Sequence, residues 1–396
     1  MTISRFVVEG LKATLAVFLL ILVRLIRPIV TIRFGQIHAR RIGHLAGNTE
    51  YYAGVQERTP SRRCLDLFCY YEPVSNRQLL LLWSRHLNVS VLYRTLWRYN
   101  RFIPGWKHHE VSLPLNEFER VRDVLESTDT HIHFTPDEIE AGLSAMQSMG
   151  MEAGAPFVCF HVRNEEYLKQ NFSDNEWGYH DFRDATTENF LLATEEMASR
   201  GYYVLRLGAA AGKPLDVHHP RIIDYASHHR TAFMDIFLLS RCRFLIGTNS
   251  GVADVADIFR TPVVRTNMTQ FFAEIPLVGQ KDLFITKKLH LRGENRSMGF
   301  NEILHSDLWE GRRTDQFDLA SVELVENSPE EIRDAAIEMD ERLKGSWIEN
   351  DRDRMEQERF WRIFTDSQVV KNPVSRIGRD FLRGNPYLSD RSVVYG

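Results

Sequence analysis

The sequence lacks the motifs of several common enzyme classes. It has no GxxxxGK[ST] loop and no GxGxxG after its first expected strand, which argues against a Walker-type nucleotide hydrolase and a dinucleotide-dependent oxidoreductase. In GTNSG, residues 247–251, serine is one position away from that of a GxSxG nucleophile elbow, so an esterase is not favoured. No HExxH occurs, and the single DxD triplet, residues 351–353, lies in a charged helical stretch. We therefore predict no required metal and no cofactor.

Cysteine is scarce and a strong net charge is absent. The four cysteines, Cys64, Cys69, Cys159 and Cys242, form no CxxC pair, and three lie in apolar, strand-like runs. This pattern favours reduced core residues and a cytosolic setting. A formal charge of −4 gives no general attraction to nucleic acid, so no nucleic-acid partner is expected. The length of 396 residues suggests two domains, each large enough for its own core.

No apolar run is long enough to cross a membrane without burying an arginine. Residues 13–23 form an apolar run without a charged residue, but a spanning helix needs about 20 residues. Basic residues flank this run: Arg5, Lys12, Arg24, Arg27 and Arg33. We favour a helix at the membrane surface within residues 5–33, with arginines toward anionic lipid, over a single span or a buried core helix. The expected location is the cytoplasmic face of the inner membrane, either peripheral or anchored by one helix.

Strand-like and helical segments alternate along the rest of the chain. IVTIRF and CLDLFCYY read as strands and NRQLLLLWSRHL as a helix, and after a Gly-Ala-Pro break at residues 154–156 the alternation restarts with PFVCFHVR. Such alternation is typical of βαβ units around parallel sheets. We expect an N-terminal helix at residues 1–27 and two doubly wound Rossmann-like domains at residues 28–153 and 154–345. Residues 346–396 would form a C-terminal helix and tail that crosses back to the first domain.

A turn of small residues follows the buried, strand-like segment RFLIG. Gly247, Thr248, Asn249, Ser250 and Gly251 precede VADVADIF, whose apolar spacing is helical. Small residues let backbone N–H groups approach an anion, and a helix N-terminus adds unpaired donors and a favourable dipole. An ordinary strand-to-helix turn with a Ser or Asn cap explains the same pattern, so the turn alone does not decide.

A second strand end carries polar groups suited to phosphate. PFVCF delivers His161 and Arg163 to one face at its carboxyl end, the edge where open α/β sheets bind ligands. Arginine grips phosphate bidentately, so Arg163 and the Ser250 turn can hold one diphosphate together. The alternative is an ion pair from Arg163 to a nearby acid: Glu165, Glu166 or Asp181.

Several segments resemble those of bacterial glycosyltransferases from surface-polysaccharide gene neighbourhoods. They cover nearly the whole chain: RIGHLAGNTEYY, VCFHVRNEEY, YHDFRDATTENF, GYYVLRLG, DIFLLSRCRFLIGTNSG and LVENSPEEI. More distantly, the His-x-Arg strand end, the aspartate helix and the IGT-x-SG turn are similar to GDP-fucose-using fucosyltransferases. These resemblances imply the GT-B fold, in which two Rossmann-like domains face a central cleft, the C-terminal domain binds the sugar nucleotide and no metal is needed.

The resemblance also implies roles for individual residues. Arg163 would hold the β-phosphate, the turn at residues 248–250 the diphosphate, and Asp235 would lie near the nucleoside. Fucosyltransferases commonly follow His-x-Arg with a further Arg and an Asp, whereas this chain has Asn164 and Glu165. That departure leaves the base of the donor open.

The loop after the first strand is expected to serve the acceptor. In GT-B enzymes this loop approaches the transferred sugar, and Gly43 and Gly47, beside Asn48, allow close backbone approach. His44 is the candidate base for the acceptor hydroxyl and Glu50 is the second choice. The alternative makes His44 an ordinary loop residue and Glu50 a helix-start acid that complements the dipole.

Two further segments are expected to contribute to the donor site. In YHDFRD, Asp181 is a candidate catalytic residue, and either it or Arg183 would bond the sugar. Arg206 and Gly208, at the end of YYVLRLG, are candidates for the nucleotide pocket, which also includes Gly251. The alternative role for the YHDFRD region is to cap the next helix through Asp184 or Thr186.

These observations predict a metal-independent glycosyltransferase of hexosyl- or deoxyhexosyl-transferase type. It would move a sugar from a nucleotide-diphosphate donor to a glycan or lipid-linked acceptor of the cell envelope or a surface polysaccharide. A nucleotide-sugar 2-epimerase of the same fold is the enzymatic alternative. The non-enzymatic alternative is a protein that binds sugar nucleotide or glycan without catalysis. The stereochemical outcome and the oligomeric state are left open.

Overall fold

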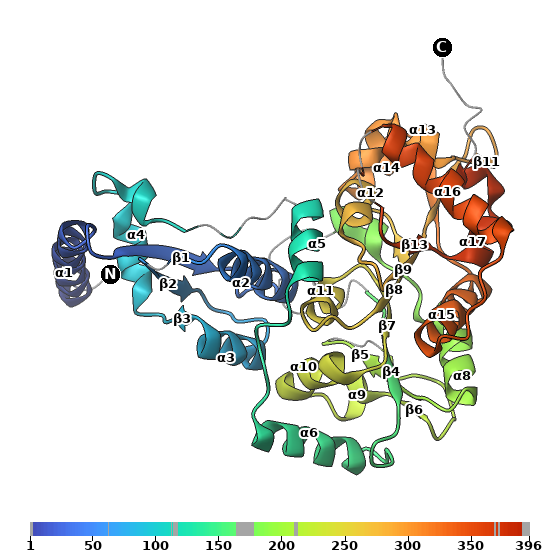
Figure 1. Cartoon of the computed structure of the whole chain (residues 1–396), viewed down its shortest axis with the longest axis horizontal. Helices are drawn as coiled ribbons and strands as arrows, with labels where there is room; N and C mark the ends of the chain where they lie inside the picture. Colours follow the sequence, from blue (N-terminus) through green and yellow to red (C-terminus); the bar gives the residue numbers. More distant parts are fainter. Residues whose placement is uncertain are drawn as a thin grey trace. The chain divides into compact units, whose positions relative to one another are not determined.

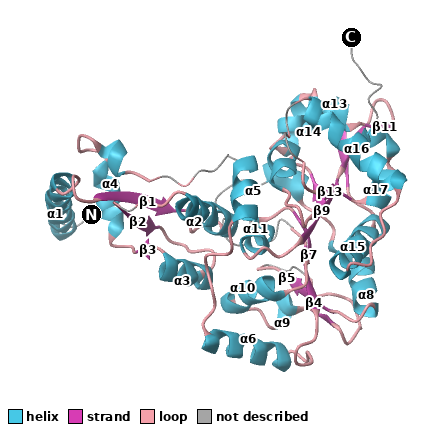
Figure 2. Cartoon of the chain, in the orientation of Figure 1, coloured by secondary structure: helices cyan, strands magenta, loops and turns pink. Residues whose placement is uncertain are grey.

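The chain folds into two compact α/β units. The computed structural model describes residues 3–61, 63–111, 113, 118–163, 178–209, 213–367, 370 and 373–389 (Figures 1 and 2). Unit 1 comprises Met1–Glu117 and Ser127–Pro136, and unit 2 comprises Phe118–Glu126 and Asp137–Gly396. The sequence-based boundary at residues 153/154 therefore falls inside unit 2. The C-terminal segment 346–396, expected to cross back to the first domain, also belongs to unit 2.

Unit 1 is built on a short parallel sheet. Its strands, in the order in which they pair, are β1 (Thr31–Ile37), β2 (Cys64–Tyr70) and β3 (Asn88–Val89). Because this order follows the chain, the three strands do not form the doubly wound sheet expected here. On the free edge of β1, one parallel bridge joins Phe34 to Glu110, and the Val111 N–H donates to the Phe34 carbonyl at 3.1 Å. Within the described residues, this bridge is the one strand-like pairing on the side of β1 opposite to β2, where a reversed strand order would place a further strand.

Helices precede, connect and follow these strands. They are α1 (Ile3–Leu25), η1 (His44–Asn48), α2 (Thr49–Arg58), α3 (Arg77–His86), α4 (Tyr93–Asn100) and η2 (Trp106–His109). In α3, the Asn76 side chain accepts a hydrogen bond from the Leu79 N–H at 2.9 Å and so caps the first turn. The same helix buries Leu79, Leu82 and Trp83, whose spacing places them on one face.

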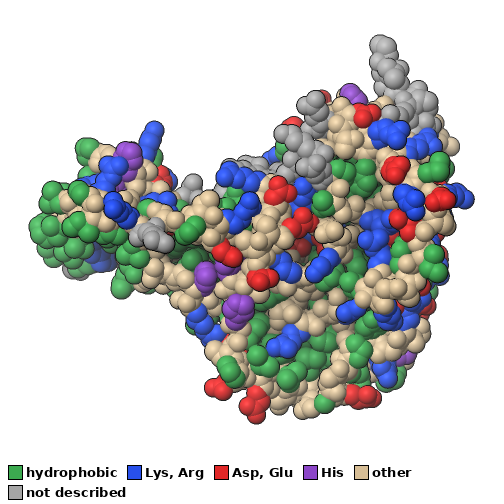
Figure 3. Space-filling model, in the orientation of Figure 1, with side chains coloured by type: hydrophobic (Ala, Val, Ile, Leu, Met, Phe, Trp, Pro, Cys, Tyr) green, Lys and Arg blue, Asp and Glu red, His purple; other side chains and the backbone are tan. Residues whose placement is uncertain are grey.

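The expected N-terminal helix forms, and its two faces are both apolar. Ala16 and Leu20 are buried on the side that packs on α4. The opposite stripe is exposed, and Figure 3 shows hydrophobic side chains gathered over α1. This stripe, named the α1 apolar face, consists of Leu11, Leu15, Phe18, Leu22 and Leu25. None of the helices in the described part of the chain combines the length and the apolar character that a membrane span requires.

Two of the arginines expected to face lipid, Arg24 in the last turn of α1 and Arg33 on β1, have protein partners instead. The Arg24 guanidinium donates to the Asn100 side chain at 2.6 Å, and Arg33 forms an ion pair with Asp66 at 2.6 Å. Both partners are distant in sequence and belong to unit 1. These two charges therefore hold the unit together, while Arg27 remains exposed.

Unit 2 contains a seven-stranded parallel sheet in the order β13-β9-β8-β7-β4-β5-β6. Its strands are β4 (Phe157–His161), β5 (Tyr203–Leu207), β6 (Ile222–Ile223), β7 (Leu245–Thr248), β8 (Val263–Met268), β9 (Leu283–Thr286) and β13 (Arg376–Ile377). From β4 the chain first builds outward through β5 and β6, and then returns to the other side with β7. The doubly wound sheet predicted for the second domain is thus confirmed, and its order reverses between β4 and β7.

Helices cover both faces of this sheet (Figure 1). Those of unit 2 are α5 (Phe118–Ser127), α6 (Pro136–Ser148), η3 (Gly178–Arg183), η4 (Thr187–Phe190), α8 (Leu191–Ser199), α9 (Tyr225–His228), α10 (Ala232–Arg241), α11 (Gly251–Ile258), α12 (Phe271–Glu274), η5 (Ile275–Leu277), α13 (Phe300–Leu304), η6 (Asp307–Glu310), α14 (Thr314–Leu319), α15 (Pro329–Lys344), α16 (Asp351–Asp366), α17 (Arg379–Gly384) and η7 (Pro386–Ser389). In Figure 1, α10 and α11 lie on one side of the sheet and α8 and α15 on the other. A small antiparallel sheet has the order β11-β10-β12. Its strands are β10 (Lys288–Leu291), β11 (Arg296–Ser297) and β12 (Val322–Val325).

The C-terminal segment is part of the unit 2 core. β13 pairs with β9, and the buried rings of Phe360 and Phe364 on α16 pack against Phe300 with centroids 5.3 and 5.6 Å apart. Burial of these rings holds α16 against unit 2, because large aromatic groups contribute much of a core's stability.

Candidate functional site

The carboxyl ends of β4 and β7 lie side by side where the strand order reverses. His161, the last residue of β4, is in register with Gly247 of β7. A Cβ at position 247 would lie 2.8 Å from the His161 carbonyl oxygen, so the two strand ends approach closely only because this residue is glycine. In open α/β sheets, a reversal of strand order leaves a crevice at this edge that commonly binds ligands.

Hydrogen bonds join the two strand ends that the sequence singled out. The Arg163 N–H donates to the Thr248 hydroxyl at 2.9 Å. The Ser250 hydroxyl lies 3.1 Å from His161 Nδ1. Ser250 is also the N-cap residue of α11, yet its side chain makes no capping bond, and Gly251 begins the helix. The first N–H groups of α11 therefore remain suited to an external acceptor at this edge.

Cationic side chains gather beside this turn. The Arg163 guanidinium contacts the Asp184 carboxylate, the Lys287 ammonium donates to the Asp184 carbonyl at 2.6 Å, and Arg183 donates to the Asn249 carbonyl at 2.9 Å. We call Arg163, Arg183 and Lys287 the cationic cluster. Burial lowers the pKa of Lys287, while neighbouring acids oppose that shift. Of the three, Arg163 contacts a carboxylate, whereas Lys287 and Arg183 donate to backbone carbonyls.

Arg163 thus has an internal partner, but not one of the three acids considered from the sequence. Asp184 takes that place, and burial raises the pKa of its carboxyl group while Arg163 opposes the shift. Asp181, the candidate catalytic residue that would bond the sugar, is exposed on η3. Residues 164–166 lie outside the described part of the chain, and with them Asn164, Glu165 and Glu166.

His161 is a hydrogen-bonding group and not a cation. Burial, together with the nearby Arg163 and Arg206 charges, lowers its pKa to about 4, so the imidazole is neutral at pH 7. Gly208, at the end of β5, has a φ of +153°, and a Cβ there would lie 4.0 Å from the His161 ring. Arg206 is buried and donates to the Lys213 carbonyl at 2.8 Å. The end of β5 therefore borders the site through Gly208, while Arg206 has a protein acceptor.

Asp235 has protein partners at the start of α10. Its carboxylate accepts a hydrogen bond from the Tyr225 hydroxyl at 2.9 Å and pairs with Arg230 at 2.8 Å. Burial raises its pKa, and Arg230 opposes the shift. These contacts connect α9 with α10, and a place near a nucleoside stays a prediction.

Sequence reasoning missed Glu274, at the end of α12. This side chain is only 6% exposed, and its carboxylate oxygens make no hydrogen bond of ideal geometry with the described residues, although the Asn249 side chain lies beside them. Burial raises its pKa to about 7, opposed first by Arg183 and then by the Asn249 side chain. A buried polar group whose hydrogen bonds are not fully satisfied is costly and marks a candidate binding group. The available signal was a lone acid in the apolar run FFAEIPL after a strand.

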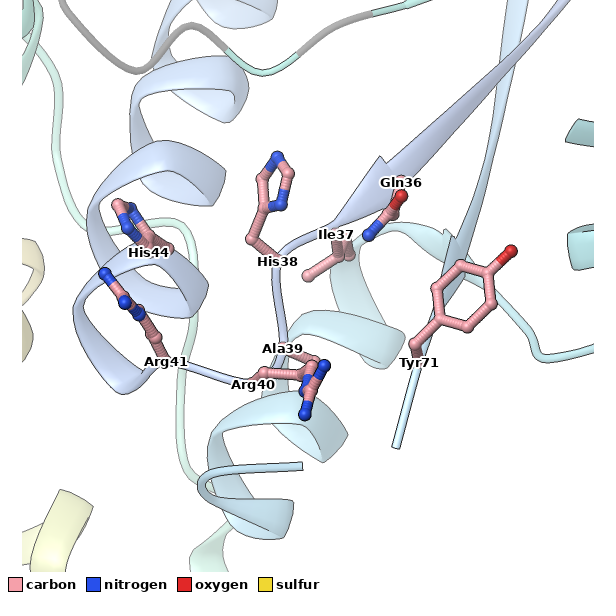
Figure 4. Close-up of a pocket in the computed structure, with 8 residues that line it drawn as sticks. All are labelled: Gln36, Ile37, His38, Ala39, Arg40, Arg41, His44 and Tyr71. Carbon is pink, nitrogen blue, oxygen red and sulfur yellow. The ribbon is translucent and has the colours of Figure 1, made fainter. Parts of the chain in front are cut away.

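The predicted acceptor loop forms the start of a helical segment in unit 1. His44 Nδ1 lies 3.0 Å from the Asn48 side-chain oxygen, and His44 lines a pocket of about 230 Å³ (Figure 4). Gly43 has ordinary helical dihedrals, and a Cβ at Gly47 would meet nothing within 4 Å. The backbone conformation at Gly43 and the open space around Gly47 therefore do not require glycine at either position. Glu50, the second candidate base, is fully buried and bonds His131 Nδ1 at 2.9 Å, outside the pocket lining.

Acidic and histidine side chains do not form a metal centre within the described residues. No group of three or more His, Cys, Asp or Glu is arranged there to hold a metal ion. All four cysteines are free thiols. Independence from metal remains a prediction.

Comparison with known proteins gives weak structural likenesses. No family model and no curated protein matches the chain. Among solved structures, it is similar to a family 9 glycosyl transferase from Veillonella parvula, with a TM-score of 0.42 and 10% identity, over 65% of this chain and 86% of that one. It is also similar to the dodecameric iron-containing heptosyltransferase TibC in complex with ADP-D-beta-D-heptose, with a TM-score of 0.40 and 13% identity, over 79% and 77%.

A third likeness is to the E. coli ADP-heptose lipopolysaccharide heptosyltransferase II, with a TM-score of 0.35 and 12% identity, over 73% of this chain and 98% of that one. All three are glycosyltransferases. At these low scores and identities, the likenesses establish neither a shared family nor a shared activity. The similarity to fucosyltransferases stays a prediction from the sequence.

Proposed function

We propose that this chain is a GT-B glycosyltransferase that transfers a sugar from a nucleotide-diphosphate donor to an acceptor of the cell envelope or a surface polysaccharide. One observation carries the proposal. The cationic cluster, the His161–Ser250 pair and the N-terminus of α11 all lie at the reversal of strand order in unit 2. An edge of this kind suits a diphosphate, which needs both cations and backbone N–H donors.

The proposed chemistry is stabilisation of the leaving nucleoside diphosphate. As the sugar departs, negative charge grows on the diphosphate, and a fixed arrangement of N–H donors and cations stabilises that charge without reorganising. The Asp184 carboxylate holds the Arg163 guanidinium, the Thr248 hydroxyl accepts from the Arg163 backbone N–H, and the Asp184 carbonyl holds Lys287. This support keeps both cations in place, so the reaction needs no metal ion. Glu274, buried beside Arg183 and Asn249, is assigned to hydroxyl groups of the donor.

Unit 1 is assigned to the acceptor. Its pocket contains His44, whose imidazole is the proposed base for the acceptor hydroxyl. The α1 apolar face supports contact with a membrane surface, and we assign that contact to the cytoplasmic side. A lipid-linked acceptor fits this combination. Sedimentation with anionic vesicles tests it, because Leu15→Ser with Phe18→Ser should release the protein, whereas the exposed Leu143→Ser on α6 should not.

Thermal unfolding with a panel of sugar nucleotides tests the donor assignment. A ligand that binds only the native chain raises the midpoint, by about 2.7 kcal/mol of stabilisation at a hundred times its dissociation constant. The panel contains UDP-, GDP-, CMP- and dTDP-sugars, and ADP-heptose because TibC binds it. A shift with one base identifies the donor class. No shift with any member contradicts the proposal.

Product analysis separates transfer from the enzymatic alternative. Purified chain incubated with the identified donor alone should leave the sugar configuration unchanged, and EDTA should not reduce transfer to an added acceptor extract. A new sugar nucleotide formed without acceptor would instead identify an epimerase. Binding of the donor with neither reaction would favour the non-catalytic alternative.

A further inference from the structure

The pocket in unit 1 is lined by basic side chains. It lies at the carboxyl ends of β1 and β2, and Figure 4 shows Arg41 and His44 beside each other with His38 across the loop. None of the lining residues is acidic. They are Gln36, Ile37, His38, Ala39, Arg40, Arg41, His44 and Tyr71. With a volume of about 230 Å³, the pocket has room for a phosphate or diphosphate group.

The loop that carries the two arginines is anchored. The buried Ala39 presents its carbonyl to the Ser75 N–H and to the Ser75 hydroxyl, each at 2.8 Å. The Leu45 N–H donates to the Arg41 carbonyl at 3.0 Å, which ties the loop to η1. Arg40 and Arg41 are exposed, and neither forms an ion pair with a described residue. The backbone of the loop is therefore fixed while its two guanidinium groups lack a protein counterion within the described chain.

The position of the pocket also favours a ligand. It lies beyond the end of β1, whose two edges pair with β2 and, through the Phe34 bridge, with Glu110. Ligands bind outside the carboxyl ends of parallel strands where the order reverses. Burial and the nearby His44 lower the pKa of His38, an effect that an anion between the two rings would oppose.

We propose that this pocket binds a phosphate or diphosphate group of the acceptor, held by Arg40 and Arg41 with His38 and His44 beside it. This inference rests on the proposed function and deepens it by naming the acceptor class, a phosphorylated lipid carrier. The α1 apolar face belongs to the same unit, so one unit offers both an apolar contact and a phosphate contact. Arginine is suited to phosphate because its guanidinium presents a fixed fork of donors.

Calorimetry with two probes tests the pocket. The probes are inorganic pyrophosphate and farnesyl diphosphate, with farnesol as the uncharged comparison. All chains carry Arg163→Ala, which weakens the competing donor site. Arg40→Gln with Arg41→Gln should weaken the binding of both diphosphate probes by roughly thirtyfold or more, because it removes two charge-assisted contacts to the diphosphate. The matched control is Arg58→Gln with Arg63→Gln, which removes two exposed charges of unit 1 outside the pocket lining.

The outcomes separate this inference from the proposed function. If the pocket and control variants weaken diphosphate binding equally, or if neither weakens it, the proposal that this pocket binds phosphate is overturned. Tighter binding of farnesyl diphosphate than of pyrophosphate supports a lipid carrier as the ligand. Equal or weaker binding of farnesyl diphosphate overturns the assignment of the ligand to a lipid carrier. In the otherwise native chain, the pocket variant should lower kcat/KM for the acceptor and leave the donor's dissociation constant unchanged. If the wild-type chain binds none of the sugar-nucleotide donors, that result would instead contradict the proposed function.

Discussion

Units 1 and 2 both place basic side chains at the carboxyl edge of a parallel sheet, but they surround them differently. In unit 2, Arg163 is mostly buried, contacts Asp184 and leaves only 13% of its side chain exposed. In unit 1, Arg40 and Arg41 are exposed at a pocket without an acid. A buried, internally supported cation has a fixed position, which suits stabilisation of charge at one point in a reaction. Exposed cations suit a ligand that must be captured from a membrane surface and released.

The largest expected effect comes from removing the supported cation of unit 2. Arg163→Ala should lower transfer by roughly a hundredfold or more, because it removes a preorganised group that stabilises the leaving diphosphate. Steady-state rates and the donor's dissociation constant measure the effect. Arg362→Ala, which removes an exposed charge on α16, is the control and should have no effect. Wild-type rates in the Arg163 variant would remove the contrast between the two edges.

Glu274 makes the contrast sharper, because unit 2 buries a carboxyl group at its site. The folded pKa of about 7 lies above the ordinary value of 4.5, so ionisation costs the native state stability as pH rises from 4.5 to 7. Glu274→Gln removes this cost and should stabilise the free protein by about 3 kcal/mol above pH 7, with no gain below pH 4.5. Denaturant unfolding across this range measures it. A gain independent of pH would show that ionisation is not the cause.

The same substitution should weaken donor binding if Glu274 bonds donor hydroxyls. Stability and binding would then change in opposite directions at pH 8, which is the signature of a site that trades stability for function. The control is Glu358→Gln on the exposed side of α16. Tighter donor binding by the Glu274 variant would contradict its assignment.

Gly247→Ala tests whether the close approach of β4 and β7 positions the site. The added Cβ would lie 2.8 Å from the His161 carbonyl, so the strand ends must separate, at a cost of about 1–3 kcal/mol. We expect a lower unfolding midpoint and weaker donor binding, measured by thermal unfolding with and without donor. Gly384→Ala is the control, because a Cβ there meets nothing within 4 Å. Unchanged donor binding would show that the register of these strands does not matter.

Residues near one another in the chain were predictable, and their distant partners were not. The ends of β4 and β7 were found because apolar runs and small-residue turns are local patterns, and the edge that joins them follows from a parallel sheet. Lys287 and Glu274 were missed because they follow β9 and β8, and only the strand order brings them near β4. Likewise, the local sequence predicts that Arg24 faces lipid, because its actual partner, Asn100, lies 76 residues away.

Ionic strength provides the smallest but most direct comparison of the two edges. Salt screens exposed charges within a Debye length of about 8 Å at physiological ionic strength, and it screens buried pairs much less. Raising salt from 0.05 to 0.5 M should therefore weaken diphosphate binding at Arg40 and Arg41 several-fold more than donor binding at Arg163. Calorimetry on the Arg163→Ala chain measures binding at Arg40 and Arg41. Calorimetry on the chain with Arg40→Gln and Arg41→Gln measures donor binding at Arg163. Equal salt dependence would mean that burial does not distinguish these two anion sites, and that charge alone governs both.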